Sequence, residues 1–292
     1  MDRLRSDFRF FHRLRVRWAE VDMQKIVFNA HYLMYLDTAI ADYWRALGLP
    51  YESALALLEG DLFVKKASLE YHASARYDDT LDIGMRRVRV GTSSIVFEGA
   101  VFCGERVLVG GELVYVFADP HSQTSKPVPD ALRKIFDAFE QGLPVVSTQL
   151  GGWDALGSLA SSLRDEVFVQ EQCIGAHMVW DDADHQAVHC VVCNGLGQPV
   201  GAGRLVQQAP GIGRIGRMAV SKVLRGTQLG RQVLFSLVDA SRARGDREVM
   251  LHAQLSAQGF YDRLGFVARG PVFEEAGIGH IDMVLPLASE TH

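Results

Sequence analysis

Apolar residues recur at helical spacing between residues 30 and 47, and they predict one long helix. At about 100° per residue the apolar stripe covers most of the circumference, and only His31, Thr38, Asp42 and Arg45 form a narrow polar face. The stripe contains Leu33, Leu36, Ala39, Ile40, Tyr43, Trp44 and Leu47, extended by Ala30, Met34 and Ala41. We expect this helix to be buried. Asp37 projects into the stripe, where an unpaired carboxylate is costly, so it needs a partner or has a function.

Shorter periodic segments surround this helix in the first half of the chain. Four β-type runs, at residues 62–72, 79–90, 94–103 and 105–117, are separated by turn residues and predict an antiparallel meander. A short helix is expected at 52–58. A second amphipathic helix is expected at 129–140, with Pro129 in its first helical position.

The pattern changes near Gly142, which divides the chain into expected domains at 1–142 and 143–292. In the second part we expect a strand at VVSTQL, a helix capped by Asp154, and a hairpin formed by 187–193 and 199–208. A strand that ends near Val220 is followed by a glycine-containing loop and a helix that stops at Gly245.

Composition narrows the classes of function. The chain has 292 residues, 48% of them hydrophobic, and its net charge of -5 gives no global reason to expect nucleic acid or an anionic membrane as a partner. Neither a signal peptide nor a run of about 20 apolar residues is present, so a cytoplasmic protein is expected. Cys190 and Cys193 form a CxxC, but in a strand they point to opposite faces, which favours reduced cysteines and no metal.

The stretch before the long helix carries an isolated carboxylate, Asp22, and Asn29, which can cap the first turn of the helix. An isolated Asp at this place is usually a turn or cap residue. However, the RxRWxExD stretch at 15–22, the VFNAHYLMYLD segment at 27–37 and the strand order resemble the hotdog-fold acyl-CoA thioesterases of the 4-hydroxybenzoyl-CoA thioesterase type.

This resemblance implies a sheet wrapped around the long helix, at least a homodimer, and catalysis by Asp22 as nucleophile or as base for water. The helix N-terminus would face the thioester carbonyl, since its free amides can stabilise an oxyanion. The expected substrate-binding residues are Asn29, Ala30, His31 and Asp37. Trp18, Lys25 and Asn29 depart from the family pattern, where many relatives have Tyr, Gly and His. Asp37 could equally be a structural acid.

The segment from Arg214 to Gly245 joins a strand to a helix through a loop whose free amides, with Arg225 and Arg231 beside them, suit pyrophosphate. Neither a Walker lysine pattern nor GxGxxG spacing is present. GRMAV at 216–220, RGTQLG at 225–230, GFYDRLGF at 259–266 and VFVQEQ at 167–172 resemble the GNAT superfamily of N-acetyltransferases.

The GNAT resemblance implies that backbone groups of Met218 and Val220 hold the pantetheine arm of acetyl-CoA. Tyr261 would protonate the departing thiolate, a reasonable role for a phenol with a pKa near 10. Amides of the loop and helix start would hold the pyrophosphate, from Arg225, Gly226, Thr227, Gln228, Leu229, Gly230 and Arg231. Gln228 stands where the family has glycine.

No general base is evident from the sequence. Glu171 is a candidate that is equally well explained as a solvated charge, and the Asp181, Asp182 and Asp184 cluster could attract a cationic acceptor or be solvated. A metal site with His185 and His189 is the least favoured interpretation.

The sequence thus predicts an α+β chain with an N-terminal hotdog fold and a C-terminal GNAT fold. Its expected functions are hydrolysis of acyl-CoA and acetyl transfer from acetyl-CoA to an amine, without a metal. In the alternative, one domain only binds acyl-CoA or dimerises. The acyl group and the amine acceptor are left open.

Overall fold

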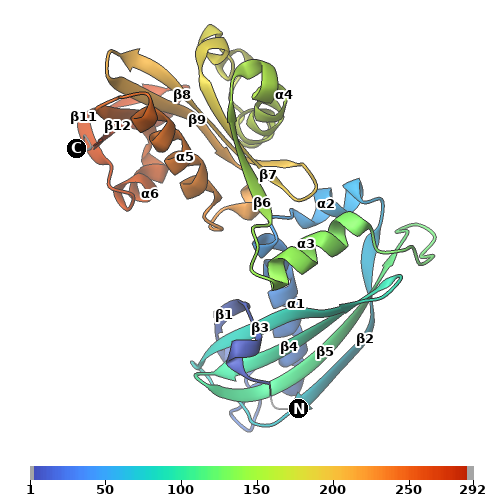
Figure 1. The fold of residues 1–292 in the computed structure, drawn as a ribbon. Helices are drawn as coiled ribbons and strands as arrows, with labels where there is room; N and C mark the ends of the chain where they lie inside the picture. The colour runs from blue at the N-terminus through green and yellow to red at the C-terminus, as the bar shows by residue number, and fades with distance from the viewer. Residues whose placement is uncertain (1–2, 288–292) are drawn as a thin grey trace. The chain divides into compact units, whose positions relative to one another are not determined.

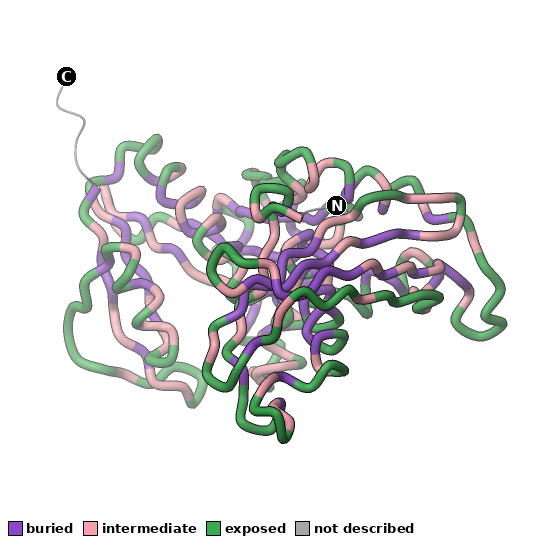
Figure 2. The backbone as a smooth tube through the Cα atoms, turned by 90° about the horizontal axis from the view of Figure 1, so that it is seen from below, coloured by how far each residue is buried: buried purple, intermediate pink, exposed green. Residues whose placement is uncertain are grey.

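The computed structural model describes residues 3–287 and divides into two compact units between Val145 and Val146 (Figure 1). The domain boundary expected after residue 142 lies just before this division. Within the described residues, every helix is too short or too polar to cross a membrane. Buried residues concentrate in the central strands and on one side of the helices, whereas the connecting loops and the edge strands at 61–71 and 267–275 are mostly exposed (Figure 2).

The first unit is a five-stranded antiparallel sheet with three helices. Its helices are α1 (Asn29–Ala46), α2 (Tyr51–Leu57) and α3 (Asp130–Glu140). Its strands are β1 (Phe10–Arg15), β2 (Asp61–Tyr71), β3 (Thr80–Val90), β4 (Ser94–Cys103) and β5 (Arg106–Ala118). The elements therefore occur where the periodicity predicts them, although Pro129 caps α3 from outside and is not its first helical residue.

The strand order, β1-β3-β4-β5-β2, differs from the predicted meander. Strands β3, β4 and β5 follow one another as expected, but β2 pairs with β5 at the far edge and not with β3. The expectation of four sequential neighbours is wrong for β2 because periodicity reports which face a strand buries and carries no information on its partner.

Helix α1 packs into the hollow of this sheet at a pair of glycines. Gly99 and Gly111 lie opposite each other on β4 and β5, and a Cβ on either would come within 2.5 or 2.6 Å of Leu36. The absence of side chains at these two positions lets the helix approach the sheet closely. The opposite face of α1 is exposed, with Leu33 and Met34 at 39% and 41%, so the prediction that most of its circumference is buried is wrong.

The second unit is a seven-stranded mixed sheet in the order β11-β12-β10-β9-β8-β7-β6. Its helices are α4 (Trp153–Arg164), which continues as a π-helical segment (Asp165–Glu171), α5 (Leu229–Ala243) and α6 (Gln258–Asp262). Its strands are β6 (Val146–Gly151), β7 (Val188–Asn194), β8 (Pro199–Ala209), β9 (Ile212–Val220), β10 (Glu248–Gln254), β11 (Val267–Glu275) and β12 (Ile278–Pro286). Gly152 caps α4, so the expected cap at Asp154 is wrong by two residues.

Helices α4 and α5 pack against different residues of the same strands. Cys190 belongs to the cluster under α5 and Cys193 to the cluster under α4, which agrees with the prediction that they point to opposite faces. Both thiols are buried and reduced. Burial raises the pKa of Cys190 to about 11, so this side chain acts as a core residue.

Two irregularities in β9 shape the second unit. Its pairing with β8 shifts between Ala202 and Arg204, where Arg217 takes a positive φ of 53°, and this bulge bends the strand. Its parallel pairing with β10 ends at Ile215 and Leu251, although both strands continue. The two strands therefore separate, and among the described residues the β10-facing edge of β9 has no strand partner from Gly216 onward.

Candidate functional site

A cavity of about 760 Å³ lies where β9 and β10 separate. Its walls come from the end of β9, the loop before α5, the end of β10 and helix α6. Seven of the nine residues predicted to hold acetyl-CoA line it, namely Met218, Val220, Arg225, Gly226, Gln228, Gly230 and Arg231. The tertiary structure thus brings together backbone groups from a strand and from a helix start.

The N-terminus of α5 opens into this cavity with unpaired amides. The first intrahelical bond is donated by Gln232 to the Gln228 carbonyl at 3.0 Å, so the amides of Leu229, Gly230 and Arg231 have no carbonyl partner in the described structure. Thr227 does not contribute, because its amide and its hydroxyl both donate to the Leu224 carbonyl. The Leu229 side chain is buried in the core, which leaves only its amide for binding.

Gln228 adopts the left-handed conformation, with φ of 71°, immediately before α5. This conformation explains why glycine is the common residue here and why Gln is strained. The side chain is exposed. The substitution therefore preserves the backbone turn at an energetic cost.

Arg225 pairs with Glu171 through two hydrogen bonds of 2.6 and 2.7 Å. The Arg225 guanidinium holds the pKa of Glu171 below its ordinary value. A low pKa and an occupied carboxylate both disfavour Glu171 as a general base, and this residue lines neither cavity described here. Its role is to orient Arg225.

Tyr261 on α6 lies in the wall shared by the cavity and a second one of about 250 Å³. Its side chain is 8% exposed, and burial raises its pKa to about 12. Within the described residues, its hydroxyl has no hydrogen-bond partner. A protonated donor is thus available at the junction, which Met218 and Gln254 also line.

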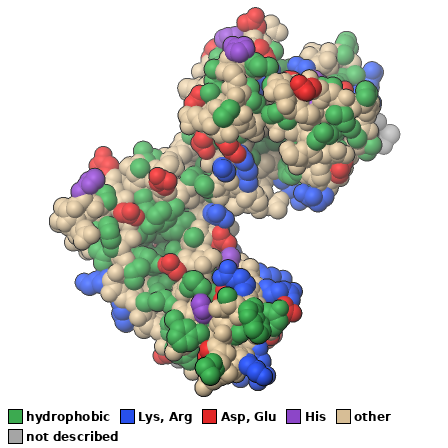
Figure 3. All heavy atoms as spheres, turned by 180° about the vertical axis from the view of Figure 1, so that it is seen from behind, with side chains coloured by type: hydrophobic (Ala, Val, Ile, Leu, Met, Phe, Trp, Pro, Cys, Tyr) green, Lys and Arg blue, Asp and Glu red, His purple; other side chains and the backbone are tan. Residues whose placement is uncertain are grey.

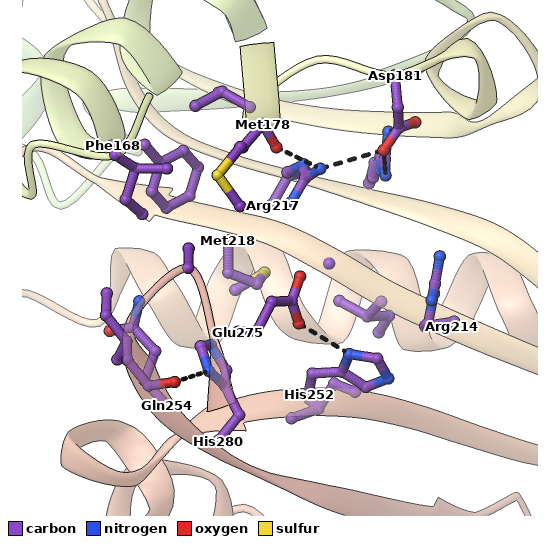
Figure 4. Close-up of a pocket in the computed structure, with 18 of the residues that line it drawn as sticks. Phe168, Met178, Asp181, Arg214, Arg217, Met218, His252, Gln254, Glu275 and His280 are labelled. Carbon is purple, nitrogen blue, oxygen red and sulfur yellow. Dashed lines mark hydrogen bonds and ion pairs between the residues drawn. The ribbon is translucent and has the colours of Figure 1, made fainter. Parts of the chain in front are cut away.

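The second cavity lies under the segment that follows the π-helix and against the β11–β12 hairpin (Figure 4). Arginines of β8 and β9 face it from one side and polar residues of β10, β11 and β12 from the other. These residues are Arg204, Arg214, Arg217, His252, Glu275 and His280, and the sequence analysis singled out none of them as functional. They belong to five strands and share no sequence motif. The sequence signal that could have indicated them is a polar side chain within an otherwise apolar strand.

The predicted acidic cluster is neutralised by arginines. Asp181 accepts two 2.6 Å hydrogen bonds from Arg204 and one of 3.1 Å from Arg217, and Arg204 lowers its pKa to about 2. Asp184 is buried against Arg164 at 2.8 Å. Of the two interpretations left open by the sequence, attraction of a cationic acceptor is therefore disfavoured for Asp181 and Asp184, and Asp182 is an exposed charge.

Two histidines in the second cavity differ in their partners. His252 Nδ1 lies 3.2 Å from the Glu275 carboxylate, and its Nε2 lies 3.6 Å from Asp282. His280 Nδ1 lies 2.8 Å from the Ile278 carbonyl, which can only accept, so this nitrogen carries the proton. His280 Nε2 then presents a lone pair, and it has no partner in the described structure.

In the first unit, Asp22 lies in a tight turn before α1. Its amide donates to the Ile26 carbonyl, its carbonyl accepts from Lys25, and its Oδ1 accepts from the Gln24 amide at 2.8 Å. Lys25 has φ of 61°, a conformation that suits the glycine common in relatives. The turn role of Asp22 is thus present, with the second carboxylate oxygen free of recorded partners.

The N-terminus of α1 is exposed at Asn29 and Ala30. The predicted cap is wrong, because Phe28 is the N-cap residue and the Asn29 side chain makes no capping bond. The His31 amide donates to the Phe28 carbonyl at 2.9 Å, so of the two amides predicted as oxyanion donors only that of Ala30 is free.

Asp37 is exposed, whereas the helical projection placed it among buried residues. It accepts a 3.2 Å hydrogen bond from the Tyr115 hydroxyl. The predicted partner therefore exists within this chain. In neither unit does the described structure contain a cluster of residues suited to a metal ion.

Comparisons with known proteins agree with this division into two units. Residues 24–110 match the thioesterase superfamily and residues 159–287 match the acetyltransferase (GNAT) domain. The chain is 35% identical over 123 residues to the uncharacterized N-acetyltransferase YjcF of Bacillus subtilis, an alignment that spans 42% of this chain and 86% of the relative. The uncharacterized protein YyaT of the same organism is 31% identical over 127 residues, with 42% and 84% covered.

A solved structure of a thioesterase superfamily protein from Jannaschia sp. CCS1 aligns at 22% identity and a TM-score of 0.44, covering 47% of this chain and 96% of that one. The opening between β9 and β10, the free amides of α5 and the matched sequence lie in the same unit. The chain therefore belongs to the GNAT acetyltransferases through its second unit and carries a thioesterase superfamily (hotdog) domain in its first.

Proposed function

We propose that the chain is a bifunctional CoA-thioester enzyme. The second unit transfers an acetyl group from acetyl-CoA to an amine, and the first hydrolyses an acyl-CoA to free acid and CoA. The observation that carries the acetyltransferase is the position of Tyr261, whose unpartnered hydroxyl lies in the wall shared by two cavities of different chemistry.

The larger cavity suits the cosubstrate. The free amides at the start of α5 and the Arg231 side chain supply positive charge for the pyrophosphate. The unpaired edge of β9 at Met218 and Val220 offers backbone groups to the amides of the pantetheine arm. The thioester then lies at the junction of the two cavities.

The smaller cavity suits the amine. His280 faces Gln254 across β10 and β12, and Gln254 lines both cavities, so the free Nε2 of His280 lies near the junction. We assign His280 as the base that takes a proton from the amine. The nitrogen forms a bond to the acetyl carbon, the carbon–sulfur bond breaks, and CoA leaves as a thiolate that the Tyr261 hydroxyl stabilises by donating a hydrogen bond to the sulfur.

The test is formation of N-acetylated product, measured by mass spectrometry with acetyl-CoA and a panel of amines. Wild type is expected to form product, and His280→Gln to lose roughly 10²-fold or more in kcat because Gln can donate and accept hydrogen bonds but cannot take up a proton. Arg242→Gln on the exposed side of α5 is the control. Full activity of His280→Gln would contradict the assignment of His280 as the base. An absence of product with wild type would contradict the acetyltransferase function.

The thioesterase proposal rests on Asp22 and the exposed start of α1. The free carboxylate oxygen of Asp22 would act as nucleophile or as base for water, and the Ala30 amide would donate to the oxyanion. Asn29, His31 and Asp37 are the further residues proposed for the substrate side.

Free-thiol release from short, long and aromatic acyl-CoAs, without amine, tests this activity. Asp22→Asn is the informative variant, since its amide oxygen can still accept from Gln24 and preserve the turn while the charge is lost. We expect release to fall by orders of magnitude in Asp22→Asn and to be unchanged in Asp130→Asn, which alters an exposed carboxylate at the start of α3. Release that persists in Asp22→Asn would contradict the proposal.

The alternative is that only one unit is catalytic and the other binds acyl-CoA or dimerises. The participation of Asp22 in a turn favours this alternative for the first unit. Protection of acyl-CoA without release of thiol would identify a binding domain.

We also propose that the first unit associates with a second copy through the exposed face of α1. Phe28, Leu33 and Met34 are exposed there, and hydrophobic side chains gather on the lower unit in Figure 3. Light scattering should give a dimer or larger for wild type and a smaller species for Leu33→Glu. A monomeric wild type would exclude this arrangement.

A further inference from the structure

The second cavity is polarised. Arg204, Arg214 and Arg217 face it from β8 and β9, while Glu275 and His252 face it from β11 and β10 (Figure 4). A cavity lined by one sign of charge at one end selects ligands of complementary charge. A charged group is available to a ligand only if it has no hydrogen bond or ion pair within the protein.

Most of these charges are already paired. Asp181 accepts hydrogen bonds from Arg204 at 2.6 Å and from Arg217 at 3.1 Å. Glu275 lies 3.2 Å from His252. The carboxylates that face the cavity are therefore occupied and provide little attraction for a second cation.

Arg214 is the exception among the described residues that line the cavity. Its side chain is partly buried, and it is the one charged group there without a hydrogen bond or an ion pair. Figure 4 shows it at one end of the cavity with no interaction drawn to a neighbour. A guanidinium with free donors is a ready partner for a carboxylate or phosphate, which it can bind through two parallel hydrogen bonds.

The position of Arg214 sets the length of such a ligand. Arg214 pairs in register with Met250, and Gln254 at the junction with the larger cavity is four residues farther along β10. At about 3.3 Å per residue this places the backbone at Arg214 and at Gln254 roughly 13 Å apart along the strand direction. The reacting amine and the anionic group are thus several bonds apart.

We propose that the acceptor is an amine that carries a carboxylate or phosphate several bonds from the reacting nitrogen, and that Arg214 binds this anionic group. The proposal rests on the acetyltransferase function of the second unit. It replaces one of the two alternatives that the sequence left open, in which the acidic cluster would attract a cationic acceptor.

The test compares three amines as acceptors of the acetyl group: 6-aminohexanoate, 6-aminohexyl phosphate and hexylamine, which has no anionic group. The protein is the whole 292-residue chain, and N-acetylated product is measured by mass spectrometry. We expect kcat/KM to be roughly 10- to 100-fold higher for the better anionic acceptor, mainly through KM. The more active of the two acids identifies the anion. Arg214→Gln should remove the preference, Arg214→Lys should keep part of it, and Arg242→Gln should leave it unchanged. Equal use of hexylamine by wild type, or a preference that survives in Arg214→Gln, would overturn the proposal.

Binding separates this proposal from the function on which it rests. Calorimetry in the presence of CoA compares N-acetyl-6-aminohexanoate and its phosphate counterpart with N-hexylacetamide. Tighter binding of an acid that is lost in Arg214→Gln supports the site even if no amine is acetylated, in which case only the acetyltransferase fails. Binding of neither acid would overturn the acceptor proposal.

Discussion

Tyr261→Phe tests the central step of the proposed transfer, because it removes one oxygen and leaves the ring in place. The hydroxyl has no partner in the described structure, and the ring packs with Phe260 and Phe266 at centroid distances of 5.0 and 5.8 Å. We therefore expect the variant to fold with unchanged stability and to bind acetyl-CoA as wild type does. Only the interaction with the departing sulfur is lost.

The size of the effect follows from the pKa of Tyr261. Burial raises it to about 12, well above the thiol pKa of about 8.5, so complete transfer of the phenol proton to the departing sulfur is unfavourable. The hydroxyl acts chiefly as a hydrogen-bond donor to the developing charge. A hydrogen bond to a charged group contributes about 1.5–3 kcal/mol, which corresponds to a loss of roughly 10- to 150-fold in kcat.

The pH dependence gives a second measure. The protonated phenol is the active form, and with a pKa of about 12 it persists throughout the range from pH 7 to 10. The ratio of wild-type to Tyr261→Phe rates should therefore be constant over this range, measured as N-acetylated product at saturating acetyl-CoA. A ratio that falls toward one between pH 8 and 10 would refute the buried, high-pKa assignment, and a ratio of one throughout would refute the donor role.

Three further predictions concern stability. Asp184→Asn should lower the free energy of unfolding, measured in urea, by about 3–5 kcal/mol, since it leaves Arg164 buried without its charge partner. Arg164→Met should lower it less, because Arg204 still pairs with Asp184. A larger loss in Arg164→Met than in Asp184→Asn would contradict this interpretation. Gln228→Gly should be at least as stable as wild type in thermal unfolding, whereas Gln228→Val should lose about 1–2 kcal/mol in the left-handed conformation; equal stability of the two variants would argue against strain. Because the pKa of Asp181 is lowered to about 2, its stabilising contribution is present above about pH 4 and is lost as the pH falls toward 2. The free energy of unfolding of Asp181→Asn should therefore change less between pH 4 and 2 than that of wild type. The same change in both proteins would exclude this contribution.

Local sequence determined the elements of this protein with useful accuracy. The strands at 94–103 and 106–118 and the helix at 29–46 follow from periodicity and turn residues, because side-chain direction repeats every two residues in a strand and every 3.6 in a helix. The division into two units was evident in the same way, from a Gly- and Pro-containing segment between two complete patterns. The loop and helix start at 225–231 were also recognisable, since their amides are contiguous in the chain.

Partnerships between distant segments required the tertiary structure. Nothing in the β2 sequence indicates that it pairs with β5, and the exposed face of α1 with Leu33 and Asp37 depends on where the sheet stops covering it. The predicted caps at Asn29 and Asp154 were wrong because a capping residue type indicates only that a bond can form.

The second cavity shows most clearly that the sequence does not reveal which distant residues pair. Acidic residues at 181–184 are adjacent in sequence and look like an anionic patch, but Arg164, Arg204 and Arg217, which neutralise them, come from a helix and two strands. His280 and Arg214 are assigned roles because the Nε2 atom of His280 and the guanidinium of Arg214 have no partner among the described residues. The sequence alone predicted most helices and strands of the first unit, several of the second, and the loop proposed to bind CoA, because these depend on neighbouring residues. The tertiary structure decided which charges remain free in the second cavity, because ion pairing depends on distances of a few ångströms between segments far apart in the chain.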